Sequence, residues 1–194
     1  TETDGLNRLL KRKPAEVNRR EVEAEIVSHS SGLRLLLASP RPGDARLQNA
    51  VANFENIVQQ LPSLSHYVVV DLGPSLSPVT SKIIKSFNEL IIVVEPIPNT
   101  IQQTTHLLND LSEAGLTETK ISIVLVNRIR SRVHLSWSQV QEQLGRTISV
   151  IFTPAPELAY QATSSNKPLV KHQPDSLSSQ QFSKLAERIA KHNR

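Results

Sequence analysis

The sequence contains no cysteine and no methionine, and only 4% of its 194 residues are aromatic. Without cysteine, disulfide bonds, a thiol nucleophile and a zinc site built on thiolates are excluded. The six histidines are scattered without the spacing of metal ligands, so we predict no histidine metal site. The sequence also has no signal-peptide pattern, no N-x-[ST] sequon and no run of 18 apolar residues. These absences favour a cytoplasmic protein without a transmembrane segment.

Glycine is scarce as well, and its placement is informative. The six glycines are isolated and none is followed by lysine, so the phosphate-binding pattern G-x-x-x-x-G-K-[ST] is missing. No G-x-S-x-G nucleophile turn is present either. We therefore do not expect this chain to hydrolyse a nucleoside triphosphate by itself.

The composition is that of one globular domain with a hydrophobic core, because 38% of the residues are hydrophobic. The net charge of +4 and a pI near 9.6 permit contact with nucleic acid or anionic lipid but do not require it. The chain starts at Thr1 and lacks methionine, so we expect it to be the carboxyl-terminal part of a longer protein. A short protein that truly begins near Thr1 is the alternative.

Apolar runs alternate with helical patterns along most of the chain. Residues 1–30 are charged and predict a helical lead-in, followed by a strand at 33–38 and a helix over 44–61. Four mainly apolar runs predict buried strands, the continuous ones at 67–70 and 90–94 and those with a single serine at 121–126 and 148–152. Helical patterns follow these runs at 79–87, 101–114, 137–144, 158–163 and 177–192. We predict one α/β domain over residues 1–194, with a doubly wound, mainly parallel sheet flanked by helices.

The run at 67–70 leads directly into Asp71, Leu72 and Gly73. A carboxylate at the end of a parallel strand lies where open α/β sheets bind ligands, and it suits a magnesium ion that a nucleotide brings. The alternative is that Asp71 only caps the following turn.

Polar residues end the other strands too. Glu95, Asn127 and Thr153-Pro154 follow the runs at 90–94, 121–126 and 148–152. Because the carboxyl ends of parallel strands share one edge of the sheet, a single ligand could meet several of these residues.

Several of these segments, in this order, resemble the MinD/ParA-type ATPases, the deviant Walker branch of P-loop proteins. SHYVVVDLGPSLSP resembles their Walker B and switch II segment, and LIIVVEPIPNTIQQTTHLLNDL their next strand and helix. ISIVLVNRIRSR is similar to the strand that ends in an Asn-Arg pair, and VIFTPAPELAYQATSSNKPLV to their closing segment. HSSGLRLLLASPRP resembles the CpaE-like branch associated with pilus assembly. The resemblance runs from about Gly32 to Val170.

The resemblance implies ATP and Mg2+ as cofactors. It implies that Asp71 orders the magnesium ion through water and that Gly73 belongs to the loop that senses the γ-phosphate. It also implies that Asn127 hydrogen-bonds adenine, with Arg128 beside it, and that Pro154 and Ala155 lie against the base. From the residues alone, a turn-forming amide at Asn127 and a loop breaker at Pro154 remain alternatives.

The chain lacks the element that defines this family, the glycine-rich phosphate-binding loop. The phosphate-binding loop, the strand before it and the strand after it have no counterpart, so the expected fold is P-loop NTPase-like with its amino-terminal strands missing. Either this chain is part of a longer ATPase, or it is a noncatalytic relative.

Two functions follow as expectations. The first is a nucleotide-dependent switch protein, acting as a homodimer, that positions or assembles a pilus or secretion system. The second is a noncatalytic scaffold or a partition-type protein that binds DNA nonspecifically through Arg128, Arg130 and Arg132. The basic amphipathic helix 177–192 also permits peripheral contact with the inner membrane, although packing against the sheet suits its short length better.

Overall fold

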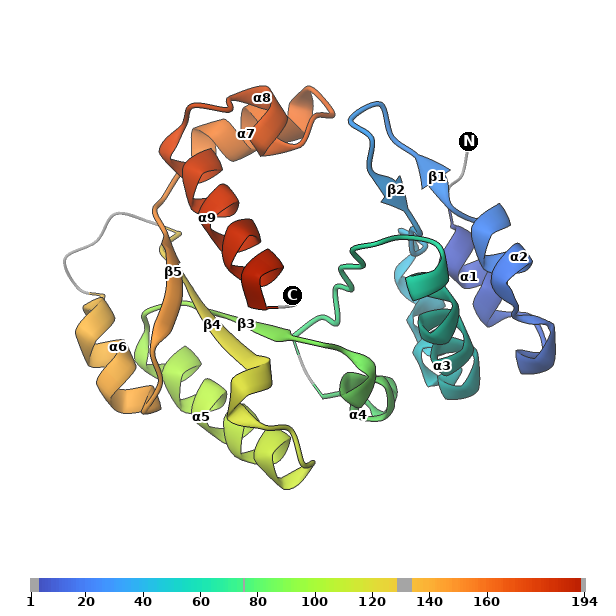
Figure 1. Ribbon diagram of the computed structural model, residues 1–194, viewed down its shortest axis with the longest axis horizontal. Coiled ribbons are helices and arrows are strands. Elements are labelled where there is room, and N and C mark those ends of the chain that lie inside the picture. Colours follow the sequence, from blue (N-terminus) through green and yellow to red (C-terminus); the bar gives the residue numbers. More distant parts are fainter. Residues whose placement is uncertain (1–3, 75, 129–133, 193–194) are drawn as a thin grey trace. The chain divides into compact units, whose positions relative to one another are not determined.

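In the computed structural model, which describes residues 4–74, 76–128 and 134–192, the backbone folds into two units, Thr1–Phe87 and Asn88–Arg194 (Figure 1). Each unit has its own buried apolar residues.

The unit Asn88–Arg194 is built on a parallel sheet with the strand order β3-β4-β5. Its strands are β3 (Leu90–Val94), β4 (Ile121–Val126) and β5 (Ile148–Phe152). β3 pairs with β4 in continuous register, whereas the β4–β5 pairing shifts between Ile123 and Val124. The predicted bounds of these three strands and their parallel arrangement are therefore confirmed.

Both faces of the central strand β4 are covered, which explains its mostly apolar sequence, whereas Val93 of the edge strand β3 is 63% exposed. Ile123 and Leu125 are buried on one face of β4. Val124 is buried on the other face, where it joins Val150 and Phe152 in a cluster that also includes Leu185. A strand buried on both faces has no reason to alternate polar and apolar residues.

Five helices follow or connect these strands in the described part of the unit. They are α5 (Pro98–Glu113), α6 (Trp137–Leu144), α7 (Pro156–Ser164), α8 (Leu169–His172) and α9 (Leu177–His192), with a 3-10 turn at Glu118–Lys120. Figure 1 shows α5 and α6 on one side of the sheet and α9 on the other. The helix predicted at 101–114 begins earlier, at Pro98, because proline presets the first helical turn.

The unit Thr1–Phe87 is mostly helical. Its elements are α1 (Gly5–Leu10), α2 (Arg19–Ala24), β1 (Val27–Ser28), β2 (Arg34–Leu35), α3 (Val51–Gln60) and α4 (Pro78–Ile83), with 3-10 helices at Pro14–Glu16, Pro42–Asn49, Leu61–Ser63 and Ile84–Ser86. Leu9, Val22 and Ile57 are buried together in its core. The predicted helix over 44–61 is divided, since its first part is 3-10 and only α3 is α-helical.

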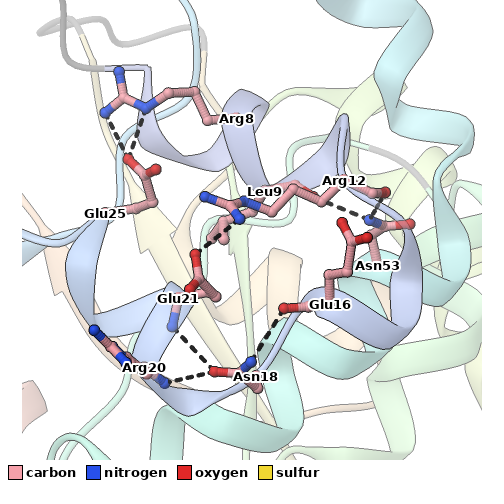
Figure 2. A network of polar contacts seen from close by, with 9 residues as sticks. All are labelled: Arg8, Leu9, Arg12, Glu16, Asn18, Arg20, Glu21, Glu25 and Asn53. Atoms are coloured by element: carbon pink, nitrogen blue, oxygen red, sulfur yellow. Dashed lines mark hydrogen bonds and ion pairs between the residues drawn. The ribbon is translucent and has the colours of Figure 1, made fainter.

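Polar contacts tie the helices of this unit to one another (Figure 2). The Asn18 side chain accepts hydrogen bonds from the backbone N–H groups of Arg20 and Glu21 and so caps α2. The Asn53 amide in α3 donates to the carbonyl oxygens of Leu9 and Arg12, both at 3.0 Å. These carbonyls lie where α1 ends and the regular helical hydrogen bonds stop, although the Leu9 oxygen also accepts the Arg12 N–H at 3.2 Å. Asn53 therefore fixes the end of α1 against α3.

Two strand predictions in this unit are wrong. Residues 67–70 form no strand: Tyr67 is 58% exposed and Val69 is 94% exposed. A strand needs a hydrogen-bonded neighbour, and no described strand pairs with this segment. The strand predicted at 33–38 shrinks to β2, which pairs antiparallel with β1 in a short hairpin.

None of the described helices is long and apolar enough to cross a membrane.

Candidate functional site

The carboxyl ends of β3, β4 and β5 bring together three of the four polar strand ends predicted from the sequence. Glu95 follows β3, Asn127 and Arg128 follow β4, and Thr153-Pro154 follows β5. The strands are parallel and adjacent, so these residues lie along one edge of the sheet. We call this set, together with Ala155, the carboxyl edge.

Asn127 extends the β4–β5 ladder by one residue. Its backbone N–H donates to the carbonyl oxygen of Phe152 at 2.9 Å, so its position beside Thr153 is fixed by the backbone. Its side chain is half-buried, and within residues 4–74, 76–128 and 134–192 no group bonds the side-chain amide. The amide thus offers one donor group and one acceptor group to a ligand at this edge.

Arg128 links the ends of β4 and β3. Its guanidinium Nη1 lies 3.2 Å from the carboxylate Oε1 of Glu95. The Arg128 side chain is 73% exposed and the Glu95 side chain 37% exposed, so water screens the pair. Behind this pair, the Leu135 N–H donates to the carbonyl oxygen of Pro96, which returns the chain to the end of β3.

The turn after β5 is held from α9. The backbone N–H of Thr153 donates to Oε1 of Gln181 at 3.2 Å, and Nε2 of Gln181 donates to Oγ1 of Thr153 at 3.4 Å. Pro154 and Ala155 are half-buried, and α7 begins directly after them. The sequence does not single out Gln181, because a glutamine on an amphipathic helix resembles its polar neighbours. Its spacing of four residues from Leu185, which contacts the sheet, is the one signal that could have found it.

Asp71 and Gly73 belong to the unit Thr1–Phe87. Oδ1 of Asp71 accepts the backbone N–H of Gly73 at 3.0 Å, and Gly73 has a φ of +73°, in the left-handed region. Asp71 thus shapes its own turn, as the alternative interpretation of the sequence expected. A carboxylate has a second oxygen, so this turn also leaves an acceptor for a hydrated cation.

The described residues contain no group of three or more His, Asp or Glu side chains that could hold a metal ion. Arg130 and Arg132, named above for DNA binding, lie outside the described residues.

No protein-family model and no curated protein sequence matches the chain. Solved structures do match it. A ParA family ATPase from Chlorobium tepidum TLS superposes with a TM-score of 0.77 at 19% identity, covering 90% of this chain and 72% of that one. The septum site-determining protein MinD complexed with Mg-ADP from Pyrococcus horikoshii OT3 superposes with a TM-score of 0.73 at 19% identity, covering 96% and 78%.

The MinC:MinD cell division protein complex from Aquifex aeolicus gives a third match, with a TM-score of 0.68 at 18% identity over 96% of this chain and 72% of that one. The chain therefore has the α/β fold of the MinD/ParA ATPases over most of its length, as the sequence resemblance predicted.

Proposed function

We propose that the chain contributes the base-binding edge and the magnesium-binding segment of a nucleotide-dependent switch protein of the MinD/ParA type. In this proposal the phosphate cradle comes from polypeptide outside these 194 residues, because no part of the sequence carries a glycine-lysine phosphate loop. The protein would act as a homodimer controlled by ATP and Mg2+.

The observation that carries the proposal is the fixed position of Asn127 beside the turn after β5. The 2.9 Å bond from the Asn127 N–H to Phe152 sets an amide next to Thr153-Pro154. An adenine edge presents a donor and an acceptor side by side, which one amide can satisfy. The rigid ring of Pro154 and the small side chain of Ala155 offer an apolar surface for the flat base. Arg128 completes the carboxyl edge and remains accessible to a ligand.

The magnesium role falls to Asp71, and Gly73 gives the following turn the freedom that a phosphate-sensing loop needs. The Mg-ADP complex of the Pyrococcus horikoshii MinD supports this assignment by fold analogy.

The biological setting we propose is the assembly or positioning of a pilus or secretion system, as in the CpaE-like branch. The strand motif HSSGLRLLLASPRP supports it. The MinD of the Aquifex aeolicus complex is bound to MinC, so a protein partner is compatible with this fold.

The missing phosphate loop favours a second candidate function, a noncatalytic scaffold that keeps the fold and its partner surface. DNA binding through Arg128 belongs to the same candidate, as does peripheral membrane contact through α9. Absence of nucleotide binding would favour it over the switch.

Calorimetric titration of the protein, as its source makes it, with ATP and GTP in the presence and absence of magnesium tests the switch. We expect ATP to bind better than GTP and Asn127→Ala to weaken ATP binding about tenfold, the loss of one or two hydrogen bonds. Asp71→Ala should remove the effect of magnesium. Asn109→Ala, on the exposed face of α5, is the matched control. A protein that ignores ATP, or an Asn127→Ala variant that binds like Asn109→Ala, would contradict the proposal.

A further inference from the structure

We infer that Gln181 of α9 is a positioning residue for nucleobase recognition: it holds the turn Thr153–Ala155 in the shape that receives the base, which makes the terminal helix part of the site. The inference rests on the proposed function of the carboxyl edge.

The backbone N–H of Thr153 lies just after β5 and has no acceptor on a neighbouring described strand. Beyond the paired residues Val126 and Phe152 the β4–β5 ladder continues only through the Asn127 N–H bond to the Phe152 carbonyl, so the Thr153 N–H has no ladder partner. A half-buried backbone N–H without a partner is costly. Gln181 supplies the missing acceptor at 3.2 Å and uses its own N–H2 on the Thr153 hydroxyl at 3.4 Å. Both ends of one amide are thus spent on one residue of the turn.

Among the described residues, Gln181 supplies the side-chain hydrogen bonds to this turn, and the backbone adds a bond from the Ala159 N–H to the Ala155 carbonyl at 3.0 Å. Pro154 has no backbone N–H to anchor it. Ala155 is the N-cap of α7 and provides no side-chain hydrogen bond to that helix. Gln181 therefore anchors the amino-terminal end of the turn whose residues are proposed to lie against the base, while α7 anchors its other end.

Several side-chain contacts hold α9 against the sheet. The ring centroids of Phe182 and Phe152 lie 4.6 Å apart, and the two ring planes make an angle of 56°. Leu185 packs on the cluster of Val124, Val150 and Phe152, and Arg188 pairs with Glu89 at 3.3 Å. Gln181, Leu185 and Arg188 recur at intervals of four and three residues, so one face of α9 carries all these contacts. A side chain on a helix held in this way is preorganised.

The test compares Gln181→Leu with Gln181→Glu. Leucine keeps the volume and removes both hydrogen bonds. Glutamate keeps an acceptor for the Thr153 N–H, and its second oxygen can accept the Thr153 hydroxyl proton. Gln180→Leu is the matched control, since the Gln180 side chain is exposed and donates a hydrogen bond to the Asp175 carbonyl oxygen just before α9, away from the turn.

Two probes separate positioning of the base from general damage: Mg-ATP, and Mg-tripolyphosphate, which has the phosphates but no base. Calorimetry on the protein as its source makes it should show Gln181→Leu binding Mg-ATP about tenfold more weakly. Tripolyphosphate binding should stay within about twofold, and Gln181→Glu and Gln180→Leu should resemble the unsubstituted protein. Thr153→Val removes only the weaker, 3.4 Å bond. Its affinity for Mg-ATP should therefore lie between that of the unsubstituted protein and that of Gln181→Leu.

Three results would overturn the inference. If Gln181→Leu weakens tripolyphosphate as much as ATP, Gln181 is only a structural residue. If all variants bind ATP like the unsubstituted protein, the turn needs no support from α9, and the proposed base site stands without this inference. If the unsubstituted protein binds ATP no better than tripolyphosphate, the carboxyl edge does not recognise a base, and the proposed function fails with it.

Discussion

Arg128 and Glu95 join the carboxyl ends of β4 and β3 through an ion pair 3.2 Å long. The pair gives the carboxyl edge one positive and one negative charge at neighbouring strand ends. Since both groups face water, we expect this contact to influence which ions approach the edge more than it stabilises the sheet.

Replacing Glu95 tests that expectation. Glu95→Gln removes a negative charge and leaves the Arg128 guanidinium without its partner. The free energy of unfolding should change by less than about 1 kcal/mol, because exposed ion pairs contribute little. Mg-ATP should bind about twofold more tightly in dilute buffer, and the gain should disappear in about 0.5 M salt. The control compares Arg128→Ala with the double variant Arg128→Ala/Glu95→Gln. If Glu95→Gln still tightens Mg-ATP binding when Arg128 is absent, release of the Arg128 charge is not the cause.

Asn53 should be among the most sensitive polar positions of the unit Thr1–Phe87. Asn53→Leu removes both hydrogen bonds to the end of α1, a buried one to the Leu9 carbonyl and a part-buried one to the Arg12 carbonyl, and leaves the Leu9 oxygen with only the Arg12 N–H. We expect a loss of about 2 kcal/mol in the free energy of unfolding, measured by urea denaturation. Asn56→Leu, in the same helix, removes one bond to the Pro14 carbonyl at a partly exposed position and should cost less than about 1 kcal/mol. Equal losses in the two variants would show that burial at Asn53 is not the cause.

Gly5 has no room for a side chain. A Cβ built on Gly5 would lie 2.6 Å from the carbonyl oxygen of Glu25, which is backbone and cannot simply rotate away. Gly5→Ala should therefore destabilise the unit by about 1–3 kcal/mol despite the better helix propensity of alanine. Gly43→Ala is the control, because a Cβ there meets nothing within 4 Å. Thermal unfolding of the two variants would decide, and an unchanged melting temperature for Gly5→Ala would contradict the contact.

Asp44 should make the stability of the same unit depend on pH. A hydrogen bond with Ser39 holds the pKa of the Asp44 carboxyl below its ordinary value of 3.8, and the nearby charge of Lys11 lowers that pKa further. A folded pKa below the unfolded value means that this stabilisation is complete above about pH 4 and is lost as the pH falls through the folded pKa. Asp44→Asn should lose stability at neutral pH and should respond less to acid below pH 4. Urea denaturation at a series of pH values measures this. If the free energy of unfolding falls equally for Asp44→Asn and for the unsubstituted protein below pH 4, Asp44 is not the source of the acid sensitivity.

The sequence predicted the unit Asn88–Arg194 well because its signals are local and mutually consistent. Strands buried on both faces read as continuous apolar runs, and left-handed glycines end the helices before β4 and β5, with φ of 86° at Gly115 and 61° at Gly145. It predicted residues 67–70 badly for a physical reason. An apolar run reports a tendency to be buried, but the strand also needs a neighbour, and no described strand supplies one.

The candidate site divides in the same way. Glu95, Asn127, Arg128 and the Thr153–Ala155 turn could be found because strand ends are positions that a pattern defines. Gln181 could not be found this way, since its role depends on how α9 lies on β5, a contact between residues 28 positions apart. The predicted strand end at Asp71 is a turn, in which the Asp71 carboxylate accepts the Gly73 N–H.

The contact between Arg188 and Glu89 spans 99 residues and has a consequence for biosynthesis. A ribosome completes β3, β4 and β5 before it makes the helix that covers one of their faces. Until residues 177–192 emerge, Val124, Val150 and Phe152 face water on the nascent chain. Apolar surface of this kind is what chaperones bind and what drives aggregation of incomplete chains. Chains released before α9 is translated should therefore be recovered as insoluble material, whatever the nucleotide does.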